Sequence, residues 1–98
     1  QFTEGFMIER PYSIAEMSEA DLIVKITGIV AEAANRSTEG VGPDMNLFEE
    51  IGVDSLGIVM VYVEMSMDFG IPEPSPDADL RAIDTITKLA AYARSFAT

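Results

Sequence analysis

The 98-residue chain contains no cysteine and no histidine. Without cysteine it can form neither a disulfide framework nor a thiolate metal site. Without histidine it lacks both the usual base that activates a serine nucleophile and a common zinc ligand. These two absences argue against a zinc protein and against a histidine-dependent hydrolase, and we expect no metal site.

Basic residues are also scarce, because six Lys and Arg stand against seventeen Asp and Glu and give a formal net charge of −11. Nucleic acid and anionic membranes are therefore poor partners, since both require clustered positive charge. No base occurs between Arg36 and Arg81, whereas ten acids do: Glu39, Asp44, Glu49, Glu50, Asp54, Glu64, Asp68, Glu73, Asp77 and Asp79. This segment should attract basic partner surfaces. The alternative is that the charges only keep a small apolar domain in solution.

Long hydrophobic runs are missing as well. The longest, residues 58–63, is far too short to cross a bilayer, and the first residues do not read as a leader with a basic and then an apolar region. The composition is nonetheless 48% hydrophobic, which indicates one small folded domain. We expect a soluble, cytoplasmic monomer. Residues 1–17 read as an extension or linker, and residues 18–98 as the domain.

Helical signals begin at Ser18, which with Asp21 resembles a capping box. Apolar residues at helical spacing then predict a helix over residues 19–35. A long loop rich in Gly, Ser and Asn follows, and we expect Leu47 and Phe48 to enter the core at its end. A second helix is predicted over residues 55–69, capped by Asp54, ended by Gly70 and apolar on more than one side.

The last third of the chain predicts a short helix or turn starting at Ser75 and Pro76, and then a final helix capped by Asp84. Phe96 is a further candidate for the inner face of that helix. The expected fold is all-α, a small four-helix bundle with three main helices, one short helix and a long first loop. The predicted core is Leu22, Ile26, Ile29, Leu47, Phe48, Val59, Leu80, Ile86 and Leu89.

Ser55, in the stretch EEIGVDSL, has two readings from the residues alone. As a nucleophile it would need a nearby base, and the sequence offers no histidine and no Gly-x-Ser-x-Gly elbow. As a structural residue it would only help to start a helix, the common use of Asp-Ser. Asp77-x-Asp79-x-Arg81 does not fit a calcium loop, because Arg81 occupies a ligand position. If Ser55 reacts, another protein must activate it.

The stretch PDMNLFEEIGVDSLGIVMVYVEMSMDFGI resembles the signature region of acyl carrier proteins, and a looser match runs from Ser18 to about Phe96. The resemblance implies a four-helix bundle in which Ser55 receives 4′-phosphopantetheine from coenzyme A. A separate magnesium-dependent phosphopantetheinyl transferase would attach this group. The terminal thiol would then hold an acyl chain as a thioester. The chain would be a carrier without catalysis of its own, served by acyl-loading, condensing and releasing enzymes.

The resemblance also assigns roles around Ser55. Asp54 would position the transferase and its metal ion, and Gly52 would allow a close turn before the helix. Leu56 would be an exposed contact for partners, with core packing as the open alternative. Further partner contacts are expected at Met60, Val63, Glu64, Glu49, Glu50 and Asp68.

The second helix departs from the family pattern, because only Glu64 and Asp68 carry charge between Ser55 and Gly70. Exposed methionine suits adaptable apolar contacts. We therefore expect an apolar docking patch around Leu56, Met60 and Val63, and a specialised polyketide-type pathway rather than housekeeping fatty-acid synthesis. Two alternatives remain: a peptidyl or aminoacyl carrier, which tends to show two glycines where this chain has one, and a non-carrier helical adaptor.

Overall fold

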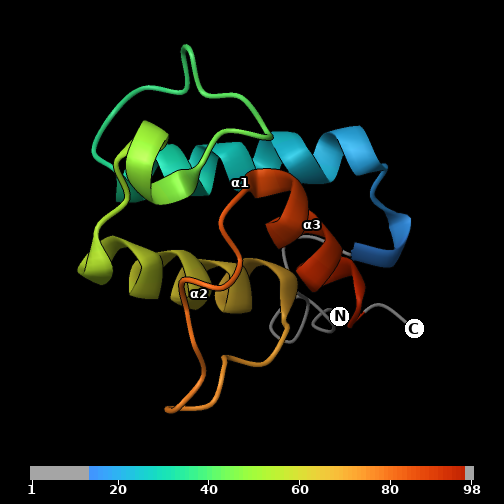
Figure 1. Ribbon diagram of the computed structural model, residues 1–98. Helices are drawn as coiled ribbons and strands as arrows, with labels where there is room; N and C mark the ends of the chain where they lie inside the picture. The colour runs from blue at the N-terminus through green and yellow to red at the C-terminus, as the bar shows by residue number, and fades with distance from the viewer. Residues whose placement is uncertain (1–13, 97–98) are drawn as a thin grey trace, which may run out of the picture.

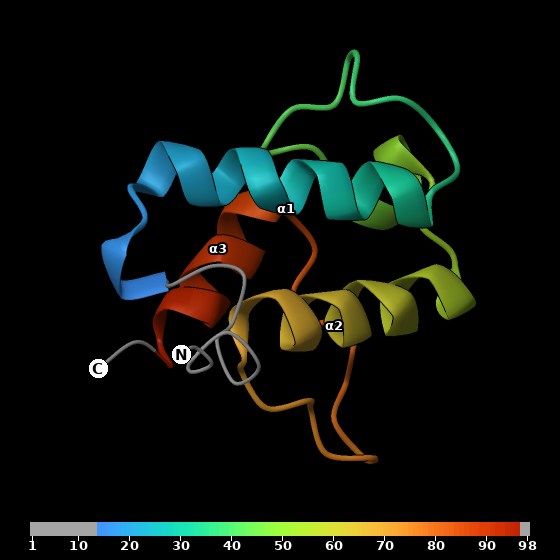
Figure 2. The same cartoon turned by 180° about the vertical axis from the view of Figure 1, so that it is seen from behind.

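The computed structural model describes residues 14–96, which form helices and connecting turns without a strand. The elements in order are η1 (Ile14–Glu16), α1 (Glu19–Ala33), η2 (Leu47–Ile51), α2 (Ser55–Phe69) and α3 (Ile86–Arg94). Helices α1 and α2 run antiparallel beside each other, and α3 lies across them near the start of α1 and the end of α2 (Figure 1; from behind in Figure 2). The predicted all-α bundle is confirmed.

Helix α1 begins as the sequence predicts, since the Ser18 side chain accepts a hydrogen bond from the Asp21 amide at 3.1 Å. Its predicted inner residues Leu22, Ile26 and Ile29 are all buried. The helix ends at Ala33, two residues before the predicted end. The loop of residues 34–46 then crosses the molecule to η2, as Figure 1 shows in green.

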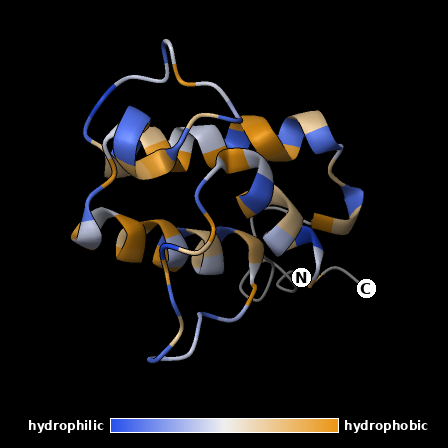
Figure 3. Cartoon of the chain, in the orientation of Figure 1, coloured by the Kyte–Doolittle hydropathy of each residue, from blue (hydrophilic) through white to orange (hydrophobic). Residues whose placement is uncertain are grey.

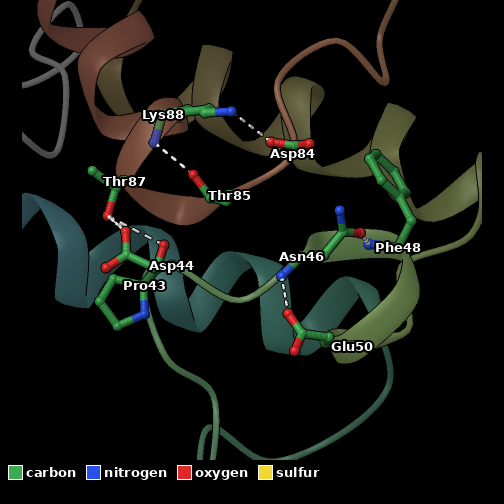
Figure 4. Close-up of polar contacts among 9 residues, drawn as sticks. All are labelled: Pro43, Asp44, Asn46, Phe48, Glu50, Asp84, Thr85, Thr87 and Lys88. Carbon is green, nitrogen blue, oxygen red and sulfur yellow. Dashed lines mark hydrogen bonds and ion pairs between the residues drawn. The ribbon is translucent and has the colours of Figure 1, made fainter.

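Element η2 is a single helical turn that the sequence analysis did not predict. Its cap is reciprocal. The Asn46 side chain accepts hydrogen bonds from the backbone amides of Phe48 and Glu49 at 2.9 and 2.8 Å. The backbone amide of Asn46 in turn donates to the Glu50 carboxylate at 2.6 Å, and Figure 4 shows this bond and the one from Phe48. Leu47 is fully buried, and Phe48 packs partly buried against the core. The long loop is therefore fastened at its end, as expected.

Helix α2 has both predicted ends, with Asp54 as its N-cap and Gly70 in the left-handed region at φ 70°. Its buried face consists of Gly57, Ile58, Val61, Tyr62, Met65 and Phe69. The assignment of Val59 to the core was wrong, because 43% of its surface is exposed. Val59 lies on a second apolar face, and helical spacing alone could not show which of the two faces would be covered.

The segment after α2 forms turns at residues 76–82, the turn option of the prediction for Ser75 and Pro76. The predicted cap of α3 was wrong by one residue: Thr85, not Asp84, accepts from the Lys88 amide. Asp84 instead pairs with the Lys88 ammonium at 3.0 Å (Figure 4). Phe96 is exposed and packs edge-on against Tyr92 instead of entering the core.

The core joins the three helices with η1 and η2. Six of the nine predicted core residues are buried: Leu22, Ile26, Ile29, Leu47, Ile86 and Leu89. Phe48 and Leu80 are partly buried and pack against this core. Two hydrogen bonds tie the loops to α3, since the Leu47 amide donates to the Asp84 carbonyl and the Thr87 amide to the Pro43 carbonyl. These links place η2, and with it the start of α2, at a fixed position on the bundle.

Candidate functional site

Ser55 is the first residue of α2 and lies at the end of the bundle away from α3 (Figure 1). Its side chain is exposed, and its hydroxyl forms no hydrogen bond with another of the residues 14–96. The neighbouring residues are firmly held, because Val53 before it and Gly57 and Ile58 after it are buried. The Ser55 hydroxyl is therefore accessible, and it lies on a helix start whose neighbouring residues are packed in place.

Asp54 fixes the first turn of α2. Its Oδ1 atom accepts from the Gly57 amide at 2.7 Å, which satisfies one of the free donors of the helix start. The predicted positioning role of Asp54 would use this carboxylate, which the cap holds on the first turn of α2. That role itself remains a prediction.

Gly57 lets the start of α2 approach the end of α1. A Cβ atom at this position would lie 3.1 Å from the Ala33 carbonyl oxygen and from Asp54 Oδ1. The sequence analysis missed this residue, although a glycine two positions after the serine of a predicted helix was a signal of close packing. Gly57 thus allows the first turn of α2, which carries Ser55, to pack closely against the end of α1.

The turn before Ser55 is held from the other side. Gly52 has φ 99°, a value that L side chains rarely adopt, so the close turn expected of it is present. The Arg36 guanidinium donates to the carbonyls of Ile51 at 3.4 Å and Glu39 at 3.2 Å. Arg36 therefore pins the long loop to the turn that leads into α2, a role that the sequence analysis did not foresee.

Apart from Arg36, the Lys and Arg side chains of the described residues make contacts away from Ser55. Lys25 pairs with Asp68, Lys88 with Asp84 and Arg94 with Glu19, while the Arg81 guanidinium lies 4.0 Å from the centre of the Phe48 ring. Residues 14–96 also contain no group of three or more acidic side chains arranged to hold a metal ion. No side chain among residues 14–96 accepts a hydrogen bond from the Ser55 hydroxyl, and this hydroxyl is suited to be a substrate for another protein.

An apolar stripe runs from Ser55 along the outer face of α2. It consists of Leu56, Val59, Met60, Val63 and Met67, which are spaced to share one helix face, and all five are exposed. Leu56 is 69% exposed and Met60 52%, so of the two readings of Leu56 the structure favours the exposed one. Apolar colour covers much of α2 in Figure 3. The predicted patch residues Leu56, Met60 and Val63 therefore do lie together.

The predicted acidic contacts are distributed over three places. Glu49 and Glu50 are exposed on η2, where Glu50 also caps the turn. Glu64 is half-buried at the edge of α2 that faces α1. Asp68 has a side chain only 17% exposed and lies 3.9 Å from Lys25, about 20 Å along the helix from Ser55. Glu64 and Asp68 are thus less accessible than Glu49 and Glu50.

The sequence model of the family described as phosphopantetheine attachment site matches residues 24–93. The chain belongs to this family. The structure agrees with that membership, since the exposed serine opens a helix in an all-helical bundle. Membership makes the chain a carrier of covalent 4′-phosphopantetheine that has no catalytic reaction of its own, as the resemblance implied.

Proteins of several bacteria that are similar to this chain are named acyl carrier protein. An acyl carrier protein of Rickettsia bellii is 33% identical over 63 residues, which cover 63% of this chain and 78% of the relative. An acyl carrier protein of Thermotoga maritima is 27% identical over 75 residues, or 76% of this chain and 90% of the relative. No solved structure gave a significant match. Among the described residues, no helix is long and apolar enough to span a membrane.

The residues of the carrier fit a group attached at the start of α2. An exposed hydroxyl leaves room for an extended arm, and the phosphate that links such an arm would lie at a helix N-terminus, where the helix dipole favours negative charge. When bound, the group supplies a thiol that this cysteine-free chain lacks. Asp54 directs one oxygen to the Gly57 amide and so does not depend on Ser55 for a partner.

Proposed function

We propose that Ser55 is the attachment residue and that the chain holds acyl intermediates as thioesters on the arm. The observation that carries this proposal is the exposed hydroxyl of Ser55, which has no hydrogen-bond partner among residues 14–96 and lies on a helix start that Asp54, Gly57 and Arg36 hold in place. A carrier needs a fixed and accessible attachment point, and the catalysts belong to its partners.

In the attachment step, the Ser55 oxygen forms a bond to the phosphorus of coenzyme A that bears the pantetheine, and the bond to adenosine 3′,5′-bisphosphate breaks. The proton of the hydroxyl passes to a base of the transferase, because no side chain among residues 14–96 accepts a hydrogen bond from the Ser55 hydroxyl. Asp54 assists by presenting its carboxylate to the transferase and its metal ion.

The direct test is intact-mass spectrometry after incubation with coenzyme A, magnesium and a broad-specificity phosphopantetheinyl transferase. The wild type should gain the mass of one phosphopantetheine, and Ser55→Ala should gain none. A folded wild-type protein that gains no mass at saturating transferase would refute the carrier proposal. Peptide mapping that found the group at another serine would also refute the assignment.

The partner surface in this proposal is the part of the apolar stripe that is formed by Leu56, Met60 and Val63. Its charged contacts are Glu49, Glu50, Glu64 and Asp68. Val63 lies about 12 Å along the helix from Ser55, so a partner that reaches Ser55 covers all three apolar residues. Partners would include acyl-loading, condensing and releasing enzymes. Met60→Ser should slow attachment of the arm without changing the fold, and an unchanged rate would exclude Met60 from the surface.

The pathway we propose is a specialised one of polyketide type, or a related fatty-acid-like pathway. It is supported by the outer face of α2, where apolar side chains prevail over acids. The same proposal takes the carrier domain as residues 18–98, which contain the family match, and residues 1–17 as an extension. It places the carrier as a monomer in the cytoplasm, where coenzyme A is available. Loading assays with malonyl, acyl and aminoacyl donors would test the cargo, and preferential loading of an amino acid would refute the acyl assignment.

A further inference from the structure

A small groove lies between α1 and α2, beside the proposed partner surface. It has a volume of about 130 Å³ and is lined by Ile29, Glu32 and Ala33 from α1 and by Met60 and Glu64 from α2. Met60 belongs both to this groove and to the apolar stripe. A partner that covers the stripe therefore also covers the groove.

The groove combines an apolar floor with two carboxylates. Ile29 is buried, Ala33 is partly buried, and Met60 contributes a polarisable side chain that is half exposed. Glu32 is exposed and Glu64 half-buried, so the charged groups lie nearer the rim than Ile29 does. A side chain that fits here needs an apolar stem and a polar head.

Neither carboxylate is neutralised within the described part of the chain. The ion pairs among residues 14–96 are Lys25 with Asp68, Lys88 with Asp84 and Arg94 with Glu19, and none includes Glu32 or Glu64. Lys25 thus pairs with Asp68, which lies one turn further along α2 than Glu64. Two like charges in one groove repel each other and attract a cation from outside.

We infer that this groove receives a lysine or arginine side chain of the partner enzyme. The alkyl stem would pack on Met60 and Ala33 while the cationic head meets Glu32 and Glu64, which is how long basic side chains divide between apolar and polar surroundings. An apolar side chain fits less well, because it would remove water from carboxylates without pairing them. The inference rests on the proposed carrier function and names the chemistry of its partner.

Such a contact would set the orientation of the partner around α2. Met60 lies about 7.5 Å along the helix from Ser55. The stripe by itself is apolar and allows several rotations of a partner, whereas one charged contact to a side groove favours a single rotation. The groove therefore contributes specificity more than area.

The test uses the full chain, with the broad-specificity phosphopantetheinyl transferase as the basic partner. The variant Glu32→Gln/Glu64→Gln removes both groove charges. Its matched control is Glu16→Gln together with Asp77→Asn, which removes two charges from exposed residues outside the proposed partner surface: Glu16 lies on η1, and Asp77 lies in the turns after α2. Thermal unfolding verifies that all variants remain folded. We expect kcat/KM for arm attachment to fall about five- to twenty-fold in the groove variant and at most about two-fold in the control.

A second measurement follows the contact itself. In protein labelled with ¹³C-methyl methionine, the Met60 methyl signal should shift on titration with the transferase at constant magnesium, and this shift should be lost in the groove variant. Equal losses of kcat/KM in groove variant and control would show a general effect of net charge and overturn the inference. An unchanged rate in both, or a Met60 shift caused by magnesium alone, would overturn it as well.

Failure of the carrier function would look different. If the folded wild type gains no phosphopantetheine at saturating transferase, the carrier proposal fails and the groove inference falls with it. If the wild type is fully modified and the groove variant is modified at the same rate, only the groove inference fails.

Discussion

Two glycines in two helices allow a matched pair of substitutions to test how closely the first turn of α2, which carries Ser55, packs against α1. Gly28 lies inside α1 and Gly57 inside α2, and each costs its helix about 1 kcal/mol relative to alanine. A Cβ atom at Gly28 would meet no atom within 4 Å. Gly28→Ala should therefore stabilise the protein by up to about 1 kcal/mol, which raises Tm by about 4–8 °C in a domain of this size.

At Gly57 the same gain is opposed by close contacts. A Cβ atom would lie 3.1 Å from the Ala33 carbonyl oxygen, 3.1 Å from Asp54 Oδ1 and 3.2 Å from Val53 Cγ1. The carbonyl belongs to the backbone of α1, and Asp54 Oδ1 is bonded to the Gly57 amide, so neither atom can move freely. Overpacking of this kind costs about 1–3 kcal/mol, and loss of the Asp54 cap costs about 1 kcal/mol.

Gly57→Ala should consequently be about 2–4 kcal/mol less stable than Gly28→Ala. Urea and thermal unfolding followed by circular dichroism at 222 nm measure both variants against the wild type. Arm attachment should slow only in Gly57→Ala, because only that variant disturbs the first turn of α2. A Gly57→Ala variant that gains as much stability as Gly28→Ala would refute the close approach of α2 to α1.

Two further predictions concern single side chains. Asp54→Asn should keep the cap and stability within a few tenths of a kcal/mol, whereas Asp54→Ala should lose about 1 kcal/mol; both should slow arm attachment, and a full rate in Asp54→Asn would exclude a role for the charge. Burial raises the pKa of Tyr62 to about 12, with smaller contributions from Tyr92 and Asp79. The folded state thus retains this proton when the unfolded state, with a pKa near 10, has lost it, so the free energy of unfolding should decrease between about pH 10 and pH 12. Unfolding of Tyr62→Phe across this range should lack that component, and tyrosinate absorbance should show Tyr62 ionising last.

The parts of the fold that the sequence predicted well depend on local signals. Ser18, Asp54 and Gly70 mark helix ends through their own side chains or backbone conformation, and all three are confirmed. The all-α class follows from the same signals together with apolar spacing. Local hydrogen bonds and steric limits act within a few residues, so a single sequence contains them.

The errors arose where the tertiary arrangement decides. Val59 and Val61 belong to the same apolar run but to different faces of α2, and Val61 is buried and Val59 exposed because α1 and α3 cover only one of these faces. Asp84 and Thr85 are both good caps, and the bond from Leu47 to the Asp84 carbonyl places the helix start one residue later. Such choices depend on contacts between distant segments, which spacing does not contain.

The candidate site shows the same division. The sequence singled out Ser55, Asp54 and the patch of Leu56, Met60 and Val63, since these residues follow one another along a helix. Glu32 and Arg36 went unnoticed as functional residues, because each approaches the site from α1 or the loop after it. A residue that contributes from another segment carries no local sign of its role.

The contacts that hold the start of α2 against α1 and the long loop limit how an acyl group on the arm can move. Arg36 holds the turn before Ser55, and Gly57 holds the turn after it against Ala33, so the Ser55 oxygen, the proposed attachment point, stays at a fixed position on the bundle. All reach must then come from rotation about the single bonds of the arm. A partner's reaction centre must lie within one arm's length of Ser55, whatever the cargo, and successive enzymes visit the same sphere instead of requiring the carrier to change shape.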